Sequence, residues 1–280
     1  ELDSMNAVTP RYEESITVRR IDLEVGDETP TFWFDDNQYL TALLNGLAIT
    51  FPPGERFFIR SVKHFMAELD DPTLNERVRA FTGQEAMHTK EHLNFNRFLD
   101  GRGFPAKAME DFVTKRIGKI QSESSPAANL ARTAALEHFT AILATALLEH
   151  PEVLERMDPA VAKLWAWHAI EEIEHRSVAF DVYKEAVDDE ELRLRMMVMT
   201  TFIFLLANII RTHILVKASG RPFELRRAFG AAKTLFGKGG LLRKIGPRYL
   251  AYYRSDFHPS ELEADALLEE AKAQYLGEAA

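Results

Sequence analysis

Residues 165–175 read Trp-Ala-Trp-His-Ala-Ile-Glu-Glu-Ile-Glu-His, and this stretch decides the fold. Its apolar residues recur at helical spacing rather than in strict alternation, which indicates an α-helix. His168, Glu172 and His175 are spaced i, i+4 and i+7, so a helix places the three side chains on one stripe. The stretch therefore predicts a buried helix that turns two imidazoles and a carboxylate towards the interior.

A second Glu-x-x-His pair, formed by Glu85 and His88, lies in an earlier helical stretch. The first helical hairpin turns near residue 70, and Glu55 and Glu85 lie equally far from that turn. The second hairpin turns near residue 155, and Glu137 and Glu172 lie equally far from it to within one residue. Because an α-helix rises about 1.5 Å per residue, each pair of carboxylates is expected to lie level on antiparallel neighbours.

Two such hairpins packed together bring four carboxylates and several imidazoles into one bundle core, which is the ligand set of dinuclear carboxylate proteins. Carboxylates bind hard cations and imidazole suits iron, whereas buried carboxylates without cations would be strongly destabilising. We predict two bound metal ions, with iron as the first expectation and manganese or zinc as alternatives. The predicted metal ligands are Glu55, Glu85, His88, Glu137, His168, Glu172 and His175.

The roles of two histidines, His168 and His92, can be interpreted in more than one way. His168 is predicted to bind metal, and the alternative is a core histidine that hydrogen-bonds a ligand. His92 continues the stripe of Glu85 and His88 one turn further along the helix. We therefore expect His92 to contact a ligand or line a cavity rather than bind metal.

The remaining sequence predicts further helices, and Pro, Gly and Asp residues mark where they begin and end. A short strand is expected at residues 16–25, and helices are expected over about residues 36–50, 54–69, 72–100, 105–123, 126–150 and 159–187. No βαβ alternation and no repeat accompanies them. The predicted fold is all-α, with one four-helix bundle over residues 36–190. Residues 1–35 form an N-terminal extension, and residues 191–280 add C-terminal helices packed on the bundle in the same domain.

Composition excludes several classes of protein. The 280 residues contain no cysteine, which rules out disulfides, thiolate metal sites and a cysteine nucleophile. The net charge of −9 argues against nucleic acid as a partner. With nothing at the N-terminus that resembles a signal peptide, we expect a cytoplasmic protein.

One apolar stretch and the basic segment after it suggest a further contact. Residues 196–210 carry no charge, and as a helix they would span roughly 22 Å, too short for a bilayer core of about 30 Å. A buried bundle helix or a homodimer interface is expected, with a peripheral membrane contact or a substrate tunnel wall as alternatives. Residues 211–254 hold eleven Lys and Arg against one acid, Glu224. Residues 196–254 could therefore also meet anionic lipid or an acidic carrier.

The ligand pattern resembles the ferritin-like di-iron superfamily. Its third histidine in His-x-x-x-Glu-x-x-His is similar to the p-aminobenzoate N-oxygenase group. The longer strings at residues 81–88, 136–140, 167–175 and 180–183 resemble a bacterial family of predicted metal-dependent hydrolases, over most of residues 30–260.

The ferritin-like resemblance also implies that Glu171 orients His88 and that Gln84 orients His175. Glutamine at position 84 departs from the commoner acid and implies a weaker donor at His175.

Three functions follow as hypotheses. The first is a di-iron oxygenase or oxidase that uses dioxygen and an electron donor to oxidise a small lipophilic or anionic substrate. The second is a hydrolase that uses a metal-activated water. The third is an iron-binding or storage protein without catalysis.

Overall fold

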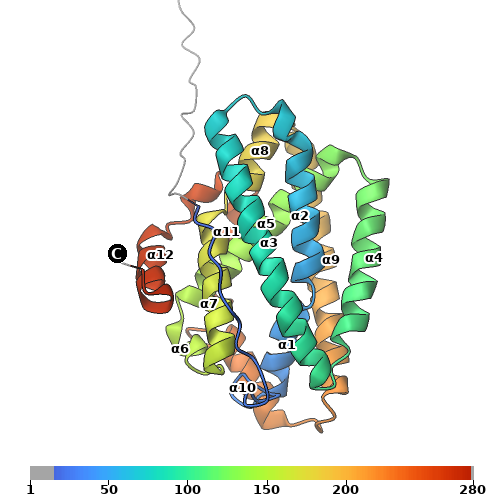
Figure 1. Ribbon diagram of the computed structural model, residues 1–280, viewed down its shortest axis with the longest axis vertical. Helices are drawn as coiled ribbons and strands as arrows, with labels where there is room; N and C mark the ends of the chain where they lie inside the picture. Colours follow the sequence, from blue (N-terminus) through green and yellow to red (C-terminus); the bar gives the residue numbers. More distant parts are fainter. Residues whose placement is uncertain (1–15, 279–280) are drawn as a thin grey trace, which may run out of the picture.

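Helices make up most of the chain in the computed structural model, which describes residues 16–278 (Figure 1). Within those residues there is no β-strand, and a single antiparallel bridge joins Phe34 to Met157. The all-α prediction is confirmed. Residues 1–15 of the expected N-terminal extension lie outside the described residues.

The centre of the molecule consists of two helical hairpins. The first joins α2 (Phe51–Phe65) through η1 (Met66–Glu68) to α3 (Pro72–Gly101). The second joins α5 (Pro126–Leu148) through α6 (Pro151–Leu154) to α7 (Pro159–Glu174), and α4 (Ala106–Glu123) connects the hairpins. Polar side chains cap three of these helices, because Asp71, Ser125 and Asp158 each accept a hydrogen bond from a backbone N–H of the first turn.

The start of α2 differs from the prediction. Phe51-Pro52-Pro53-Gly54 was expected to separate two helices, yet α1 (Gln38–Ala48) ends before it and α2 already begins at Phe51. The first turn of a helix has N–H groups without helical partners, so two prolines fit there without losing a hydrogen bond.

A second correction concerns the helix expected over residues 159–187. It is interrupted, because α7 ends at Glu174 and α8 (Val178–Ala186) begins after a turn. The buried Arg176 in this turn donates from Nη1 to the carbonyl oxygen of Ile173 at 2.7 Å. The turn contains neither Gly nor Pro, so the local sequence gave no sign of it.

The strand expected at residues 16–25 is also absent. These residues, called the strap below, run extended along α3 and α7 (Figure 1). The strap bonds to helix side chains instead of a neighbouring strand: Gln84 donates to the Thr17 carbonyl, and the Leu23 N–H donates to Glu91. Gly83 permits the close approach, since a Cβ there would lie 2.6 Å from Val18.

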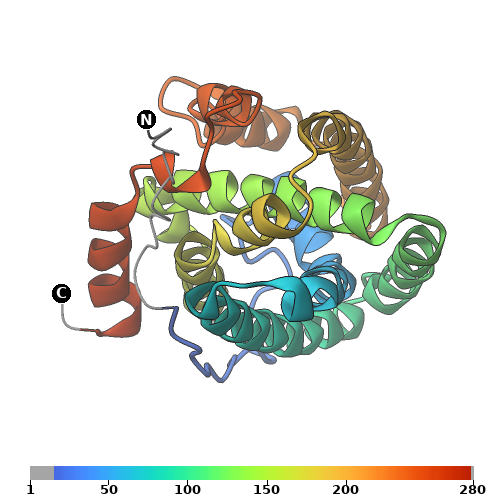
Figure 2. The same cartoon turned by 90° about the horizontal axis from the view of Figure 1, so that it is seen from above.

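The C-terminal helices enclose the bundle from two sides. Helix α9 (Glu190–Ala218) packs lengthwise on α1 and α5, and α10 (Leu225–Phe236) and α11 (Ile245–Ala251) follow it. Seen from above, α9 to α11 lie on the side opposite α3 (Figure 2). After η2 (Pro259–Glu261), helix α12 (Asp265–Ala271) and the π-helical turn η3 (Lys272–Leu276) pack against α7.

Candidate metal centre

The seven predicted ligands converge inside the bundle. Helices α2, α3 and α5 contribute Glu55, the Glu85/His88 pair and Glu137, respectively. Helix α7 contributes His168 and Glu172, and His175 follows in the turn after it. All seven side chains are buried, with at most 3% of any residue exposed.

Their donor atoms form three overlapping groups that could each hold a metal ion. Glu55, His88 and His168 form one group, and Glu85, Glu137 and His175 form another, with donor atoms within 4.8 Å of one another. The third group joins Glu85, His88 and Glu172 under the same limit. Glu85 and His88 each belong to two of these groups, so the third group links the other two, and the arrangement suits two neighbouring ions.

Short distances join the donor atoms within and between these groups. Nε2 of His175 lies 3.2 Å from Oε1 of Glu85 and 3.4 Å from Oε2 of Glu137. Nε2 of His168 lies 3.1 Å from Oε1 of Glu172, and Nδ1 of His88 lies 3.6 Å from the same oxygen. In each of these three histidines, the other ring nitrogen points away from the cluster.

Hydrogen bonding tests whether these residues fit metal ions. Within the described residues, each of the seven side chains has at least one buried nitrogen or oxygen atom without a hydrogen-bond partner. Glu85 and Glu137 each have two such oxygens. Buried polar atoms are normally paired, so a cluster of unpaired acceptors from seven side chains fits bound cations.

The pKa shifts of the buried carboxyl groups and histidines also favour bound cations. Burial raises the pKa of Glu55 and Glu137 well above the usual range, and the nearby Glu85 carboxylate raises both further. Burial lowers the pKa of His88 well below its usual range, and the other histidines add to this effect. Burial acts against the charged form of Glu172 too, but the adjacent imidazoles of His168 and His175 bring its pKa well below normal. Two divalent ions would offset the mutual repulsion of these carboxylates.

A second layer of residues holds the imidazoles. Nε2 of His88 lies 3.0 Å from Oε2 of Glu171, and Nδ1 of His175 lies 2.8 Å from Oε1 of Gln84. These are the two pairs expected from the ferritin-like resemblance. His92 belongs to none of the three metal-donor groups, but its Nε2 lies 2.8 Å from Nδ1 of His168. Each contact fixes the ring orientation of a candidate ligand.

A third layer of charge was not predicted from the sequence. Glu174 is buried and receives hydrogen bonds from Gln84 at 2.7 Å and from Arg19 of the strap at 2.8 Å. Lys272 of η3 lies 3.2 Å from the other oxygen of Glu174. Arg19 also contacts Glu171, whose pKa is raised to about 8 by burial despite that contact. Arg19 and Lys272 come from distant parts of the chain, so no local pattern could have pointed to them.

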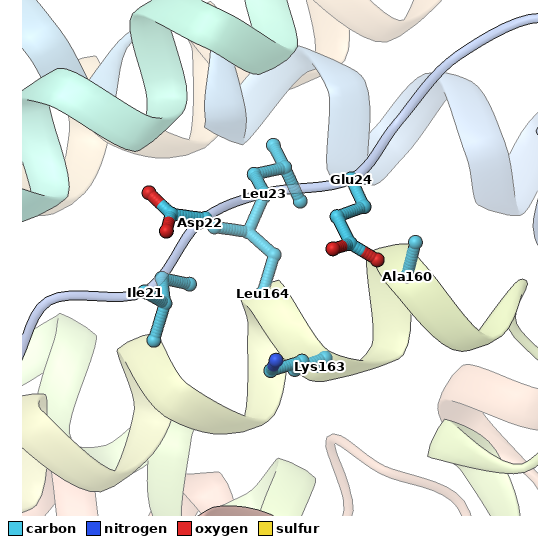
Figure 3. A pocket seen from close by; sticks show the side chains of 7 residues that line it. All are labelled: Ile21, Asp22, Leu23, Glu24, Ala160, Lys163 and Leu164. Carbon is cyan, nitrogen blue, oxygen red and sulfur yellow. The ribbon is translucent and has the colours of Figure 1, made fainter.

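Aromatic rings enclose the cluster. The ring of Phe51 stacks on His168 at 4.5 Å, Trp167 meets His88 edge-on at 4.8 Å, and Phe81 meets His175 edge-on at 4.9 Å. A small surface pocket lies elsewhere, where residues 21–24 of the strap pass over α7 (Figure 3). A second surface pocket, between α2 and α4, includes none of the candidate ligands either.

Comparison with known proteins gives one match. The model of a family described as predicted metal-dependent hydrolase matches residues 17–263, a range that contains all seven candidate ligands. No curated protein and no solved structure matches the chain. By this match, the chain belongs to the family of predicted metal-dependent hydrolases.

Proposed function

We propose that the protein is a metal-dependent enzyme with a dinuclear centre held by Glu55, Glu85, His88, Glu137, His168, Glu172 and His175. The observation that carries this proposal is the set of unpaired buried donor atoms that these seven side chains direct into one cluster. A structural role alone would leave four buried carboxylates without cations, and an ionised carboxylate buried in this way costs several kcal/mol.

Hydrolysis is the first candidate reaction, and the family description supports it. Two bound ions would supply a water of lowered pKa and polarise an ester or phosphate oxygen. The protein would contribute the fixed positions of the ligands. Glu171 and Gln84 would hold the imidazoles of His88 and His175, while the burial of the site would keep bulk water out.

Oxygen activation is the second candidate, and the enclosure of the site favours it. The ligands are nearly inaccessible, and aromatic rings surround the histidines. Such a site admits dioxygen more easily than a bulky ester. The carboxylate and imidazole ligand set also suits iron, which would supply redox chemistry with an external electron donor.

One experiment separates these candidates. Protein is purified without added metal or a histidine tag, and its metal content is measured by plasma mass spectrometry. About two iron ions per chain, with oxygen uptake by the reduced protein, would establish oxygen activation. Zinc or manganese, with turnover of p-nitrophenyl esters that requires the metal, would establish hydrolysis.

Variants test the centre itself. We expect Glu85→Ala and Glu172→Ala to lose most of the bound metal, whereas Glu149→Ala, in a surface ion pair with Arg248, keeps it. Wild-type metal content in both cluster variants would refute the assignment.

A further inference from the structure

Helix α9 exposes a continuous apolar surface. Its side towards the bundle packs on α1 and α5, while Phe202, Leu205 and Ile209 point outward at i, i+3 and i+7. Phe202 and Ile209 are 69% and 68% exposed, respectively. Single exposed apolar residues are ordinary, but a stripe of them along a helix marks a contact surface.

Helix α10 extends this surface. Leu225, Phe229 and Phe236 are spaced i, i+4 and i+11, so they share one side of the helix, and each is at least 69% exposed. Ala231 on the opposite side is buried. Both helices lie on the side of the molecule opposite α3 (Figure 2). The exposed apolar side chains of α9 and α10 are called the apolar face below.

Positive charge accompanies the apolar face. Several basic residues of this segment pair with acids, such as Arg221 with Asp36 and Arg248 with Glu149. Others are exposed and have no ion-pair partner among residues 16–278: Lys217, Arg226, Lys233, Lys238 and Arg243. In α10, Arg226 and Lys233 flank the stripe of Leu225, Phe229 and Phe236 on one side. Unpaired cations beside exposed apolar side chains complement an anionic, partly apolar partner.

We propose that the apolar face binds the surface of a bilayer that contains anionic lipids, as a monotopic contact. Phenylalanine and leucine side chains would enter the headgroup boundary, and the flanking cations would meet lipid phosphates. A second copy of the chain is a poorer occupant, because a symmetric contact would bring unpaired cations of like sign together without acids to meet them.

The same helix does not cross the membrane in this arrangement. Helix α9 is the one helix in the described part of the chain that is long and apolar enough to span a membrane. However, Arg193 lies buried within the protein and donates to the Tyr252 carbonyl, and Asn208 and Leu215 are buried on the side of α9 towards the bundle. Spanning would require α9 to leave α1 and α5 and break these contacts.

Vesicle sedimentation tests the proposal on the whole protein. We expect binding to vesicles of phosphatidylcholine and phosphatidylglycerol at least tenfold tighter than to phosphatidylcholine alone, and weaker binding in high salt. The double variant Phe229→Ser/Phe236→Ser should lose binding to both. The double variant Arg226→Glu/Lys233→Glu should lose the preference for anionic vesicles.

Two controls keep this result interpretable. Phe112→Ser and Lys115→Glu change an exposed phenylalanine and an exposed lysine of α4, so both variants should bind like the wild type. Circular dichroism checks that every variant is folded. Failure of the folded wild type to bind anionic vesicles overturns the proposal. So does a stable dimer in light scattering that Phe229→Ser/Phe236→Ser dissociates. Neither outcome depends on the metal or on catalysis.

Discussion

At the scale of single residues, hydrogen bonding separates two kinds of side chain around the candidate metal centre. The seven candidate ligands each keep a buried atom without a partner within the described residues, whereas Gln84 and Glu171 have partners for all their polar atoms. This difference is expected if the seven side chains bind metal and if Gln84 and Glu171 position the ligands. His92 also has an Nδ1 without a partner among residues 16–278, and it is distinguished from the ligands by position instead: it belongs to none of the donor groups and contacts His168 through Nε2.

Loss of the carboxylate beside His88 should weaken metal binding without abolishing it. We expect Glu171→Ala to lower metal affinity about 10- to 100-fold, because His88 loses the partner that fixes its ring. Competition with a chromophoric chelator measures the affinity. Glu171→Gln retains an acceptor and should have a smaller effect. Equal losses in both variants would show that charge, not orientation, is the contribution of Glu171.

Arg211 on α9 offers a different kind of test, because it is a largely buried cation. Its Nε has no hydrogen-bond partner within the described residues, and burial lowers its pKa to about 10. Removal of the charge should therefore stabilise the protein, and we expect Arg211→Met to raise the free energy of unfolding by about 1 kcal/mol. Urea denaturation measures this change.

The matched control for Arg211 is Arg221→Met. Arg221 pairs with Asp36 and lies over the ring of Phe32, so its loss should destabilise. A destabilised Arg211→Met would mean that Arg211 makes favourable contacts in solution.

At the scale of helices, the register of the hairpins was predictable from the sequence. The interruption after α7 and the contacts of the strap were not. Glu55 and Glu85 meet because antiparallel helices rise equally per residue, which places residues equidistant from a turn at the same height. The interruption after Glu174 was missed because no Gly or Pro marks it, and Arg176 supplies the hydrogen bond to Ile173. The strap was predicted as a strand because extended sequence alone does not reveal that its partners are helix side chains.

The strap should contribute measurably to stability through Arg19. Arg19 contacts Glu171, Glu174 and Glu278, and its side chain is only 10% exposed. We expect Arg19→Ala to lower the free energy of unfolding by roughly 2–4 kcal/mol, because Glu171 loses its cation and Glu174 loses one of two. The neighbouring exposed Arg20→Ala is the control and should change it by less than about 0.5 kcal/mol. Similar values for the two variants in urea denaturation would contradict this role.

At the scale of the whole molecule, the proposed metal centre would supply the interior of the bundle with cations that the chain itself does not provide. The acids at the edge of the cluster pair with Arg19 and Lys272, whereas the four central carboxylates face one another, histidines and, for Glu55, the hydroxyl of Thr89. Folding and metal binding are therefore expected to be coupled, since ions that bind only the folded state stabilise it.

Metal removal should reveal this coupling. We expect chelation to lower the melting temperature of the wild type and Glu137→Gln to lower the melting temperature of the metal-loaded protein. In the metal-free state the order should reverse, because Glu137→Gln removes a carboxyl group whose ionised form is disfavoured by burial and by the neighbouring Glu85. Differential scanning calorimetry with and without chelator measures all four values. A variant less stable than the wild type in both states would argue against repulsion in the metal-free cluster.

The contacts of Glu174 also bear on the order in which the protein is completed during its synthesis. Arg19 leaves the ribosome early, whereas Lys272 follows more than 250 residues later. A nascent chain that already contains all seven candidate ligands therefore still lacks one of the two cations that neutralise Glu174 beneath them. Loading of the centre is thus expected to follow the synthesis of Lys272 rather than that of the last candidate ligand, His175.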